Sequence, residues 1–371
     1  MNQSSFKSWI ALSSCCLLLV CSIIYYFTYQ KEPSIQTYSA TLTDIGFDTS
    51  LSFEAECTSE EFDQYISIIE EKYKYYNQLF DQYNEYEGVN NVYTLNQNAY
   101  SHPVEVDEEL IDCIQTALDI NEISTQFDIT QGCLLSLWHT YRLEGMELNN
   151  EGKNGNLPTE IEITEAKKHG GKENILIEDN TITYLDPNLS IDLGGIAKGY
   201  ATQKVKEALI DAGCSHAFIN AGGNVALIGL KSDGSDWNVG IHSPDSNSAL
   251  LDYICSDSKC IVTSGDYQRY YTVDNTKYSH IIDIQTGYPA NYVRSVTVIM
   301  DNSCLADALS TTLFCMSVED GMKLVDQLKQ SYDIEVVWIV DQQTSSLSPY
   351  LSNKNYDVYI TNDLKESVVF A

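Results

Sequence analysis

One stretch of the sequence combines glycines, a predicted helix start and a lysine in a way that suits an anionic ligand. Residues 190–193 are typical of a strand, Gly194 and Gly195 follow as a turn, and 196–212 is typical of a helix whose first turn carries Lys198. Glycines let a ligand approach the backbone closely, while free N–H groups, the helix dipole and a lysine favour an anion. This predicts a phosphate site, although the spacing matches neither the Walker nor the dinucleotide motif and a plain tight turn is the commoner interpretation.

Asp307 and Thr311 form a second candidate site. They are four residues apart in a segment with helical character, so they lie on one face of the helix. Mg²⁺ takes oxygen ligands, often one carboxylate with hydroxyl or carbonyl oxygens and substrate phosphates. The pair is therefore a candidate for holding Mg²⁺. The alternative is that Asp307 caps the start of the helix.

Two neighbouring segments, 263–267 and 278–283, bring hydroxyls, carboxylates and a histidine together. A serine hydrolase built from Ser264, His280 and Asp266 is conceivable. However, Ser264 lies in no nucleophile elbow, and Ser-Gly-Asp is more often a turn. His280 is equally open to a structural interpretation, because strand-like residues flank it.

The pattern of elements predicts an α+β fold, since strands and helices do not alternate regularly. Thr58 and Glu61 form a capping box ahead of an amphipathic helix of about 22 residues. Residues 81–100 are typical of a loop, and 149–157 of an exposed insertion. Further helices are expected at 106–123, 161–169, 306–316 and 319–330. Strands are expected within 37–56 on either side of Gly46, around Ile175 and Ile182, and at 216–220, 225–230, 237–241, 278–284, 294–300 and 335–340.

The charge balance limits the possible partners. With 21 Lys+Arg against 53 Asp+Glu, the 371-residue chain has a formal charge of −32 and no basic cluster. Nucleic-acid binders need such clusters, so this class is excluded. The eight cysteines beyond residue 35 form no close CxxC pair, which argues against a zinc site and favours buried free thiols.

The N-terminus carries a long apolar segment. Residues 9–29 contain no charge, with Lys7 before them and Lys31 after them, and the run is long enough to cross a bilayer as a helix. We expect a signal-anchor with a short tether over residues 1–34, so that one body, 35–371, lies at the cell membrane on the extracytoplasmic side. A lipoprotein modified at Cys15 or Cys21 is the alternative.

Taken together, the chemistry-bearing segments resemble the ApbE family of FAD:protein FMN transferases, and they occur in the family's order across roughly residues 37–345. The matching segments are Phe127-Asp128-Ile129-Thr130 with Leu137-Trp138, residues 192–200 (DLGGIAKGY), Asn220-Ala221-Gly222-Gly223, residues 263–267 (TSGDY), residues 280–283 (HIID) with 286–289 (TGYP), and residues 307–311 (DALST). Two departures stand out: Ile45-Gly46-Phe47 replaces a usual Met-Gly-Thr, and Asn224 replaces an aspartate after the glycine pair.

The resemblance implies a single two-lobed, T-fold-like α+β domain that binds FAD with its pyrophosphate beside Mg²⁺. FMN would be transferred to a Ser or Thr hydroxyl of an acceptor protein, usually a subunit of a membrane redox system, with release of AMP. It implies metal ligation by the Gly195 carbonyl, Asp307 and Thr311. His280 is the first choice as base, because an imidazole pKa lies closest to neutral pH, and Asp266 is the second. The residues expected to contact FAD are Tyr83, Gln126, Phe127, Asp128, Lys198, Thr263, His280 and Ile281.

Two other functions stay open from the sequence. The same site would serve a Mg²⁺-dependent FAD pyrophosphatase if water replaced the acceptor hydroxyl. The departures from the family pattern would also suit a surface protein that holds FAD without turnover.

Overall fold

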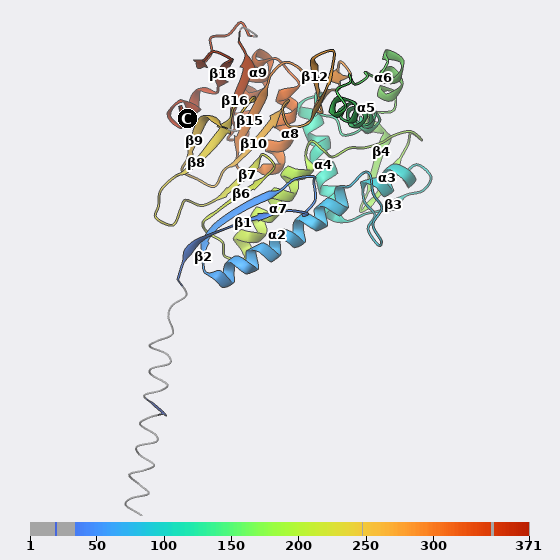
Figure 1. Cartoon of the computed structure of the whole chain (residues 1–371). Coiled ribbons are helices and arrows are strands. Elements are labelled where there is room, and N and C mark those ends of the chain that lie inside the picture. The colour runs from blue at the N-terminus through green and yellow to red at the C-terminus, as the bar shows by residue number, and fades with distance from the viewer. Residues whose placement is uncertain (1–18, 21–33, 247, 343–344, 371) are drawn as a thin grey trace, which may run out of the picture.

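The computed structural model describes residues 19–20, 34–246, 248–342 and 345–370, and a nine-stranded antiparallel sheet forms its centre (Figure 1). In spatial order the strands are β1 (Gln36–Leu42), β2 (Leu51–Cys57), β6 (Ala217–Ala221), β7 (Asn224–Ile228), β10 (Cys260–Gly265), β15 (Ser295–Met300), β16 (Glu335–Asp341), β18 (Tyr356–Ile360) and β17 (Leu351–Ser352). Every neighbouring pair is antiparallel, which confirms the predicted α+β class.

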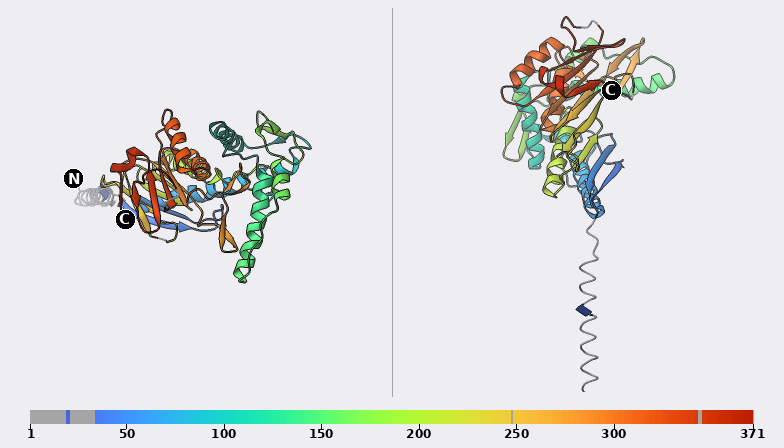
Figure 2. Two further views of the ribbon diagram at one scale, coloured as in Figure 1. Left: turned by 90° about the horizontal axis from the view of Figure 1, so that it is seen from above. Right: turned by 90° about the vertical axis from the view of Figure 1, so that its left-hand side faces the viewer.

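Both faces of the central sheet are covered, so its middle strands are apolar on both sides. On β16, Val336 and Trp338 pack in a cluster with helical residues, whereas Val337 and Ile339 pack with a small second sheet. The helices are α2 (Ser59–Phe80), α7 (Ala197–Asp211), α8 (Ser303–Phe314) and α9 (Val318–Leu328), and the second sheet is formed by β8 (Trp237–His242), β9 (Ala249–Cys255) and β19 (Val368–Phe370). The right-hand view of Figure 2 shows α8 and α9 on one side of the strands.

A second group of elements lies beyond the helices, at the opposite end of the molecule from β8 and β18 (Figure 1). Its helices are α3 (Val92–Asn98), α4 (Glu108–Ile123), α5 (Gly132–Asn150) and α6 (Glu160–Lys167). Its strands are β3 (Val104–Glu105), β4 (Ile175–Glu178), β5 (Thr181–Tyr184), β11 (Tyr270–Val273), β12 (Thr276–Ser279), β13 (Ile282–Asp283) and β14 (Tyr288–Pro289). Trp138 of α5 and Tyr271 of β11 lie in a separate apolar cluster that joins this helix to the β11–β12 hairpin.

Local sequence signals account for several of these elements. Thr58 and Glu61 form the predicted capping box, and the buried face of α2 carries Ile69, Tyr73 and Tyr76. The helix predicted at 196–212 is present as α7, and Gly213 ends it with a φ of +93°, a conformation that favours glycine.

Other predictions were wrong in detail. Residues 81–100 are not all loop, because the Asn91 side chain accepts a hydrogen bond from Thr94 N and starts α3. The strand expected at 190–193 is only an isolated bridge between Gln131 and Ser190. Helix α5 and strands β9, β10 and β11 were not predicted, and the expected strand at 278–284 is interrupted at His280 and Ile281.

The membrane anchor expected over residues 1–34 falls almost wholly outside the described residues. Within the described ranges, no helix is long and apolar enough to cross a bilayer. The eight cysteines of the body are free thiols, and all of them except Cys133 are buried.

Candidate active site

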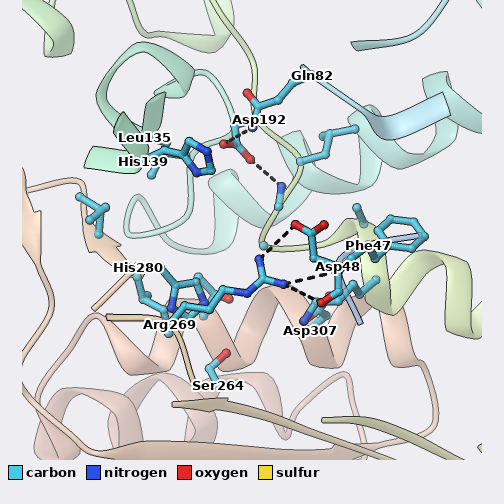
Figure 3. Close-up of a pocket in the computed structure, with 18 of the residues that line it drawn as sticks. Phe47, Asp48, Gln82, Leu135, His139, Asp192, Ser264, Arg269, His280 and Asp307 are labelled. Carbon is cyan, nitrogen blue, oxygen red and sulfur yellow. Dashed lines mark hydrogen bonds and ion pairs between the residues drawn. The ribbon is translucent and has the colours of Figure 1, made fainter. Parts of the chain in front are cut away.

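A cavity of about 620 Å³ opens between α7 and α8 of the main layer and α5 of the second group (Figure 3). It brings together residues from widely separated parts of the chain. Of the predicted site residues, those that line it are Tyr83, Gln126, Phe127, Asp128, Gly195, Lys198, Thr263, His280, Ile281, Asp307 and Thr311. Asp266 alone does not line it.

The deep wall of the cavity carries the predicted cation ligands. Asp307 on α8 is 4% exposed, and one of its carboxylate oxygens accepts a hydrogen bond from the Gly199 N–H at 2.7 Å. Burial raises the pKa of Asp307, while Lys198 and the Gly199 N–H oppose that shift. A Cβ atom on Gly195 would lie 3.6 Å from the Thr311 hydroxyl, so these two residues are neighbours. Carboxylate, hydroxyl and turn backbone therefore meet at one place.

Helices α7 and α8 can approach this closely because of a glycine at their contact. A Cβ atom at Gly199 would lie 2.4 Å from the Asp307 Cβ and 2.4 Å from the Ser303 carbonyl oxygen. No side chain fits at that distance, so an alanine would push the helices apart. Gly199 thus fixes the depth at which Asp307 sits.

The donor set on this wall fits a hard cation. It offers one carboxylate and one hydroxyl beside the backbone of Gly195, and among the described residues no group of three or more His, Cys, Asp or Glu could hold a metal ion. Mg²⁺ is commonly bound by one or two carboxylates together with substrate phosphates. The Thr311 hydroxyl has no hydrogen-bond partner within the described part of the chain, which leaves it available as a ligand.

Lys198 lies in the first turn of α7 and lines the same wall. Its ammonium forms no ion pair with any residue that the structure describes, although it acts electrostatically on Asp307 and His280. A lysine without a carboxylate partner in a cavity is suited to an anionic ligand.

His280 follows directly after β12, and it lines the cavity apart from the wall that carries Lys198, Asp307 and Thr311. Its backbone N–H donates to the Arg269 carbonyl at 3.0 Å, while its ring Nδ1 is buried without a hydrogen-bond partner in the described chain. Burial, followed by the charges of Arg269, Arg142 and Lys198, lowers the pKa of His280 to about 3. The expectation of an imidazole pKa near neutral pH is therefore wrong for the ligand-free pocket, in which the ring is neutral.

Asp266 is held elsewhere. The Arg294 Nε donates to its carboxylate at 2.6 Å, and the same guanidinium binds Asp245 and Asp341. Burial raises the pKa of Asp266, with Arg294 opposing the shift. Among the described residues Asp266 forms no hydrogen bond with His280, and its carboxylate belongs to an arginine-centred network outside the cavity.

The serine-hydrolase alternative fails on the same geometry. The Ser264 hydroxyl lies 2.7 Å from the Ser310 hydroxyl, which in turn donates to the Asp307 carbonyl. A Ser-His-Asp triad needs the serine hydroxyl to bond to the histidine and the histidine to bond to the aspartate. Neither bond is formed between Ser264, His280 and Asp266.

The residues expected to contact the flavin all line the cavity, but their side chains differ in the partners that they already have. Tyr83 stacks on His139 with ring centroids 4.9 Å apart. The Asp128 carboxylate accepts from the Thr130 N–H at 2.9 Å and hydroxyl at 2.6 Å, so it shapes its own turn. The Gln126 side-chain oxygen is buried without a partner in the described chain. Gln126 is therefore the more available of the two for a ligand.

The mouth of the cavity contains residues that the sequence did not single out. Figure 3 shows the Arg269 guanidinium between His280 and Asp48, where it donates to the Phe47 and Asp48 carbonyls at 3.5 and 3.3 Å. Arg142 hydrogen-bonds His139 at 2.8 Å. Only Arg269 had a sequence signal, its place two residues after the 263–267 segment. Nothing in the local pattern marks Arg142 or His139.

The loop beside Arg269 has an unusual backbone. Phe47 and Asp48 have φ values of +56° and +49°, which non-glycine residues rarely adopt. The Asn77 side chain accepts from the Phe47 N–H at 2.7 Å and helps to hold this conformation. Strain of this kind persists where surrounding contacts over-determine it, as at ligand sites.

Comparisons with known proteins agree with this site. The model of the ApbE family matches residues 45–338. The FAD:protein FMN transferase of Vibrio cholerae is 32% identical over 283 residues, which cover 73% of this chain and 81% of the relative. The crystal structure of the ApbE protein from Thermotoga maritima has a TM-score of 0.70 at 33% identity, covering 82% of this chain and 94% of that one. The flavin transferase ApbE from Vibrio cholerae gives 0.71 at 25% identity, covering 90% and 100%.

These similarities place the chain in a class of transferases that share this α+β fold. The matched segment includes α7, α8 and every predicted site residue. The chain belongs to the ApbE family.

Proposed function

We propose that this enzyme transfers FMN from FAD to a serine or threonine hydroxyl of an acceptor protein and releases AMP. The observation that carries the proposal is one cavity in which Asp307, Thr311 and Lys198 lie on one wall and a neutral His280 lies on another. The relatives named FAD:protein FMN transferase support it.

The deep wall suits the pyrophosphate of FAD. Asp307, Thr311 and the Gly195 carbonyl would hold Mg²⁺, which supplies electrostatic stabilisation of phosphoryl oxygens when bound. Lys198 adds a positive charge, and the dipole of α7, whose N-terminus lies at the cavity, favours an anion. A strongly negative protein can bind an anionic cofactor here because the local field is opposite to the global one.

The reaction is an in-line displacement. The acceptor oxygen forms a bond to the FMN-side phosphorus, the bridging P–O bond breaks, and AMP leaves with the bridging oxygen. The acceptor hydroxyl loses its proton, and the neutral imidazole of His280, which lines the cavity, is the group that would accept it. We assign the proton transfer to His280 rather than to Asp266, because Arg294 binds the Asp266 carboxylate and this residue does not line the cavity.

Substrate binding corrects the low basicity of His280. Three cations, Arg269, Arg142 and Lys198, contribute to its lowered pKa. A bound pyrophosphate offsets these charges and raises the pKa of His280 toward the working pH. The histidine would thus become an effective base only when FAD is in place.

We further propose that residues 1–34 anchor the enzyme in the cell membrane, with the catalytic body on the extracytoplasmic side. The uncharged segment 9–29 supports this proposal. A membrane redox subunit is then the fitting acceptor.

The test is direct. The purified full-length chain is incubated with FAD, MgCl₂ and candidate acceptor proteins, and flavin fluorescence is read on a denaturing gel. A fluorescent acceptor band that requires the divalent cation supports the proposal. Release of free FMN and AMP without any protein adduct would contradict it in favour of a pyrophosphatase, and FAD retention without turnover would contradict it in favour of a flavin-holding protein.

A further inference from the structure

The hairpin of β11 and β12 leads into the cavity, because His280 follows the last residue of β12. It packs against α5, on the side of the second group of elements that faces the main sheet (Figure 1). The outer edge of β11 is already occupied. Thr272 accepts from the Gly155 N–H at 3.0 Å, and its N–H and carbonyl bond to the Asn149 side chain at 2.6 and 2.9 Å.

The register shows which backbone groups of β12 point outward. In an antiparallel pair, residues alternate between hydrogen-bonded and non-hydrogen-bonded positions. His280 N–H donates to the Arg269 carbonyl, so these two residues form a bonded position, and Thr272 opposite Lys277 directs its groups away from the partner strand. Both observations agree that Lys277 and Ser279 direct their N–H and carbonyl groups away from β11.

These outward groups are unpaired. No described residue hydrogen-bonds the backbone N–H or carbonyl of Lys277 or Ser279. Lys277 is exposed, but Ser279 is 6% exposed, and its side-chain hydroxyl is buried without a partner in the described chain. Buried polar groups are nearly always paired, because an unpaired one loses its hydrogen bonds to water without replacement. The outward backbone groups of Lys277 and Ser279 lack a partner among the described residues, and an added strand would supply their hydrogen bonds.

The unpaired edge of β12 ends beside His280. The Ile281 carbonyl, next on the same edge, accepts from the Ala290 N–H at 2.9 Å, and Ile282 pairs with Pro289 in the β13–β14 ribbon. A strand added to β12 is thus stopped at His280. With a rise of about 3.3 Å per residue, a residue following one paired with Ser279 lies within reach of His280.

We infer that the open edge of β12 binds an extended segment of the acceptor protein as a third strand, which delivers its serine or threonine hydroxyl to His280. This inference rests on the proposed function and adds how the acceptor is recognised. Main-chain hydrogen bonds to Lys277 and Ser279 would give the affinity, as in other complexes formed by strand addition. The segment must be extended and must lack proline at the two bonding positions.

A backbone scan of the acceptor tests the inference. The probe is a library of synthetic decapeptides that each carry a single threonine, from which the peptide with the fastest FMN transfer by the full-length enzyme is taken. Its amides are then N-methylated one at a time, outside the threonine. We expect transfer to fall more than tenfold for methyl groups at alternate residues and less than threefold between them, because only alternate N–H groups face β12.

A matched pair of enzyme variants tests the same edge. Lys277→Pro removes the outward N–H without touching a bond to β11, whereas Lys277→Ala keeps the N–H and removes the side chain. We expect Lys277→Pro to raise the KM for the peptide at least tenfold and Lys277→Ala to change it less than threefold. FAD affinity, measured by flavin fluorescence, should stay unchanged in both.

The outcomes separate this inference from the proposed function. Transfer by the wild-type enzyme without any alternation in the methyl scan overturns strand addition and leaves the transferase standing. Equal losses in the two Lys277 variants indicate side-chain recognition and also overturn it. A concentration-dependent dimer that Lys277→Pro dissociates would show that a second copy of the chain occupies the edge. If no acceptor or peptide is ever modified, the proposed function fails and this inference with it.

Discussion

Asp307 on the deep wall is 4% exposed, whereas the side chain of Asp48 at the mouth of the same cavity is 91% exposed. The deep wall is formed by two helices packed closely at Gly199 and held by the main core. The mouth is formed by a strained loop, an arginine and a stacked ring pair brought from distant segments. The contrast indicates that close helix packing fixes the deep wall, whereas the mouth depends on contacts between segments that are distant in the sequence.

The largest effect should come from removing the buried carboxylate. We expect Asp307→Ala to lower Mg²⁺-dependent FMN transfer by at least about a hundredfold, because oriented electrostatic groups of this kind are worth about 10²–10³ in rate. The matched control, Asp48→Ala, should keep most of the activity, since its carboxylate is exposed to solvent. Equal losses in the two variants, measured as initial transfer rates, would show that the metal assignment is wrong.

Replacing Asp307 should lower activity but raise stability. Burial raises the pKa of Asp307, which means that its charge opposes folding at neutral pH. We expect Asp307→Asn to raise the free energy of unfolding of the ligand-free protein at pH 7 by about 1–3 kcal/mol, while transfer stays lost. Denaturant titration measures this change. A less stable Asp307→Asn protein would mean that the charge is compensated in the apo state.

The lowered pKa of His280 should be visible in how the free energy of unfolding depends on pH. Its pKa is about 3 in the folded chain and about 6.5 when unfolded, so between these values the unfolded chain binds more protons and stability falls as the pH falls. Between pH 7 and pH 5, the wild type should lose about 2 kcal/mol more than His280→Gln. Denaturant titrations at the two pH values measure the difference.

The catalytic part of that prediction uses the same variant. His280→Gln should lower kcat by about a hundredfold or more and leave FAD affinity within a few fold, as expected for loss of a proton acceptor. If instead FAD affinity collapses while kcat is kept, His280 serves binding and the base lies elsewhere.

A variant of Asp266 distinguishes a catalytic role of this carboxylate from a structural one. Burial raises the pKa of Asp266 despite the bond to Arg294, so removing its charge in Asp266→Asn should change the free energy of unfolding by less than about 1 kcal/mol, with kcat changed less than threefold. Thermal unfolding and transfer rates are compared on the same preparation. A loss of kcat without a loss of stability would restore Asp266 as a base.

The smallest effect is expected at the mouth. His139→Ala removes the ring that stacks on Tyr83 and the acceptor of the Arg142 hydrogen bond. Stacked ring pairs contribute about 0.5–1.5 kcal/mol, so the KM for FAD should rise about two- to tenfold with kcat unchanged. His242→Ala, on an exposed position of β8, is the control and should change neither constant. A loss of kcat in His139→Ala would place this histidine among the reacting groups.

The sequence predicted the deep wall better than the mouth. Gly195, Lys198, Asp307 and Thr311 line one cavity as expected, because each pair lies within one short segment whose local structure fixes the spacing. At the mouth, Arg142 and His139 come from an element with no local signal, and only its place after the 263–267 segment marks Arg269. Asp266 is a residue for which the motif was misleading. Its place in the 263–267 segment suggested a catalytic role, and only the fold shows that Arg294 binds its carboxylate.

The sequence by itself determined the elements that carry local start and stop signals and the spacing of the residues within them. The capping box at Thr58, the stop at Gly213 and the four-residue step from Asp307 to Thr311 depend only on neighbouring residues. The tertiary structure decided what those residues do. It buried His280 among three cations and lowered its pKa, and it left one edge of β12 open beside it. The burial of a side chain, the electrostatic field around it and the pairing of its backbone groups all depend on its neighbours in space. A short stretch of sequence does not specify those neighbours.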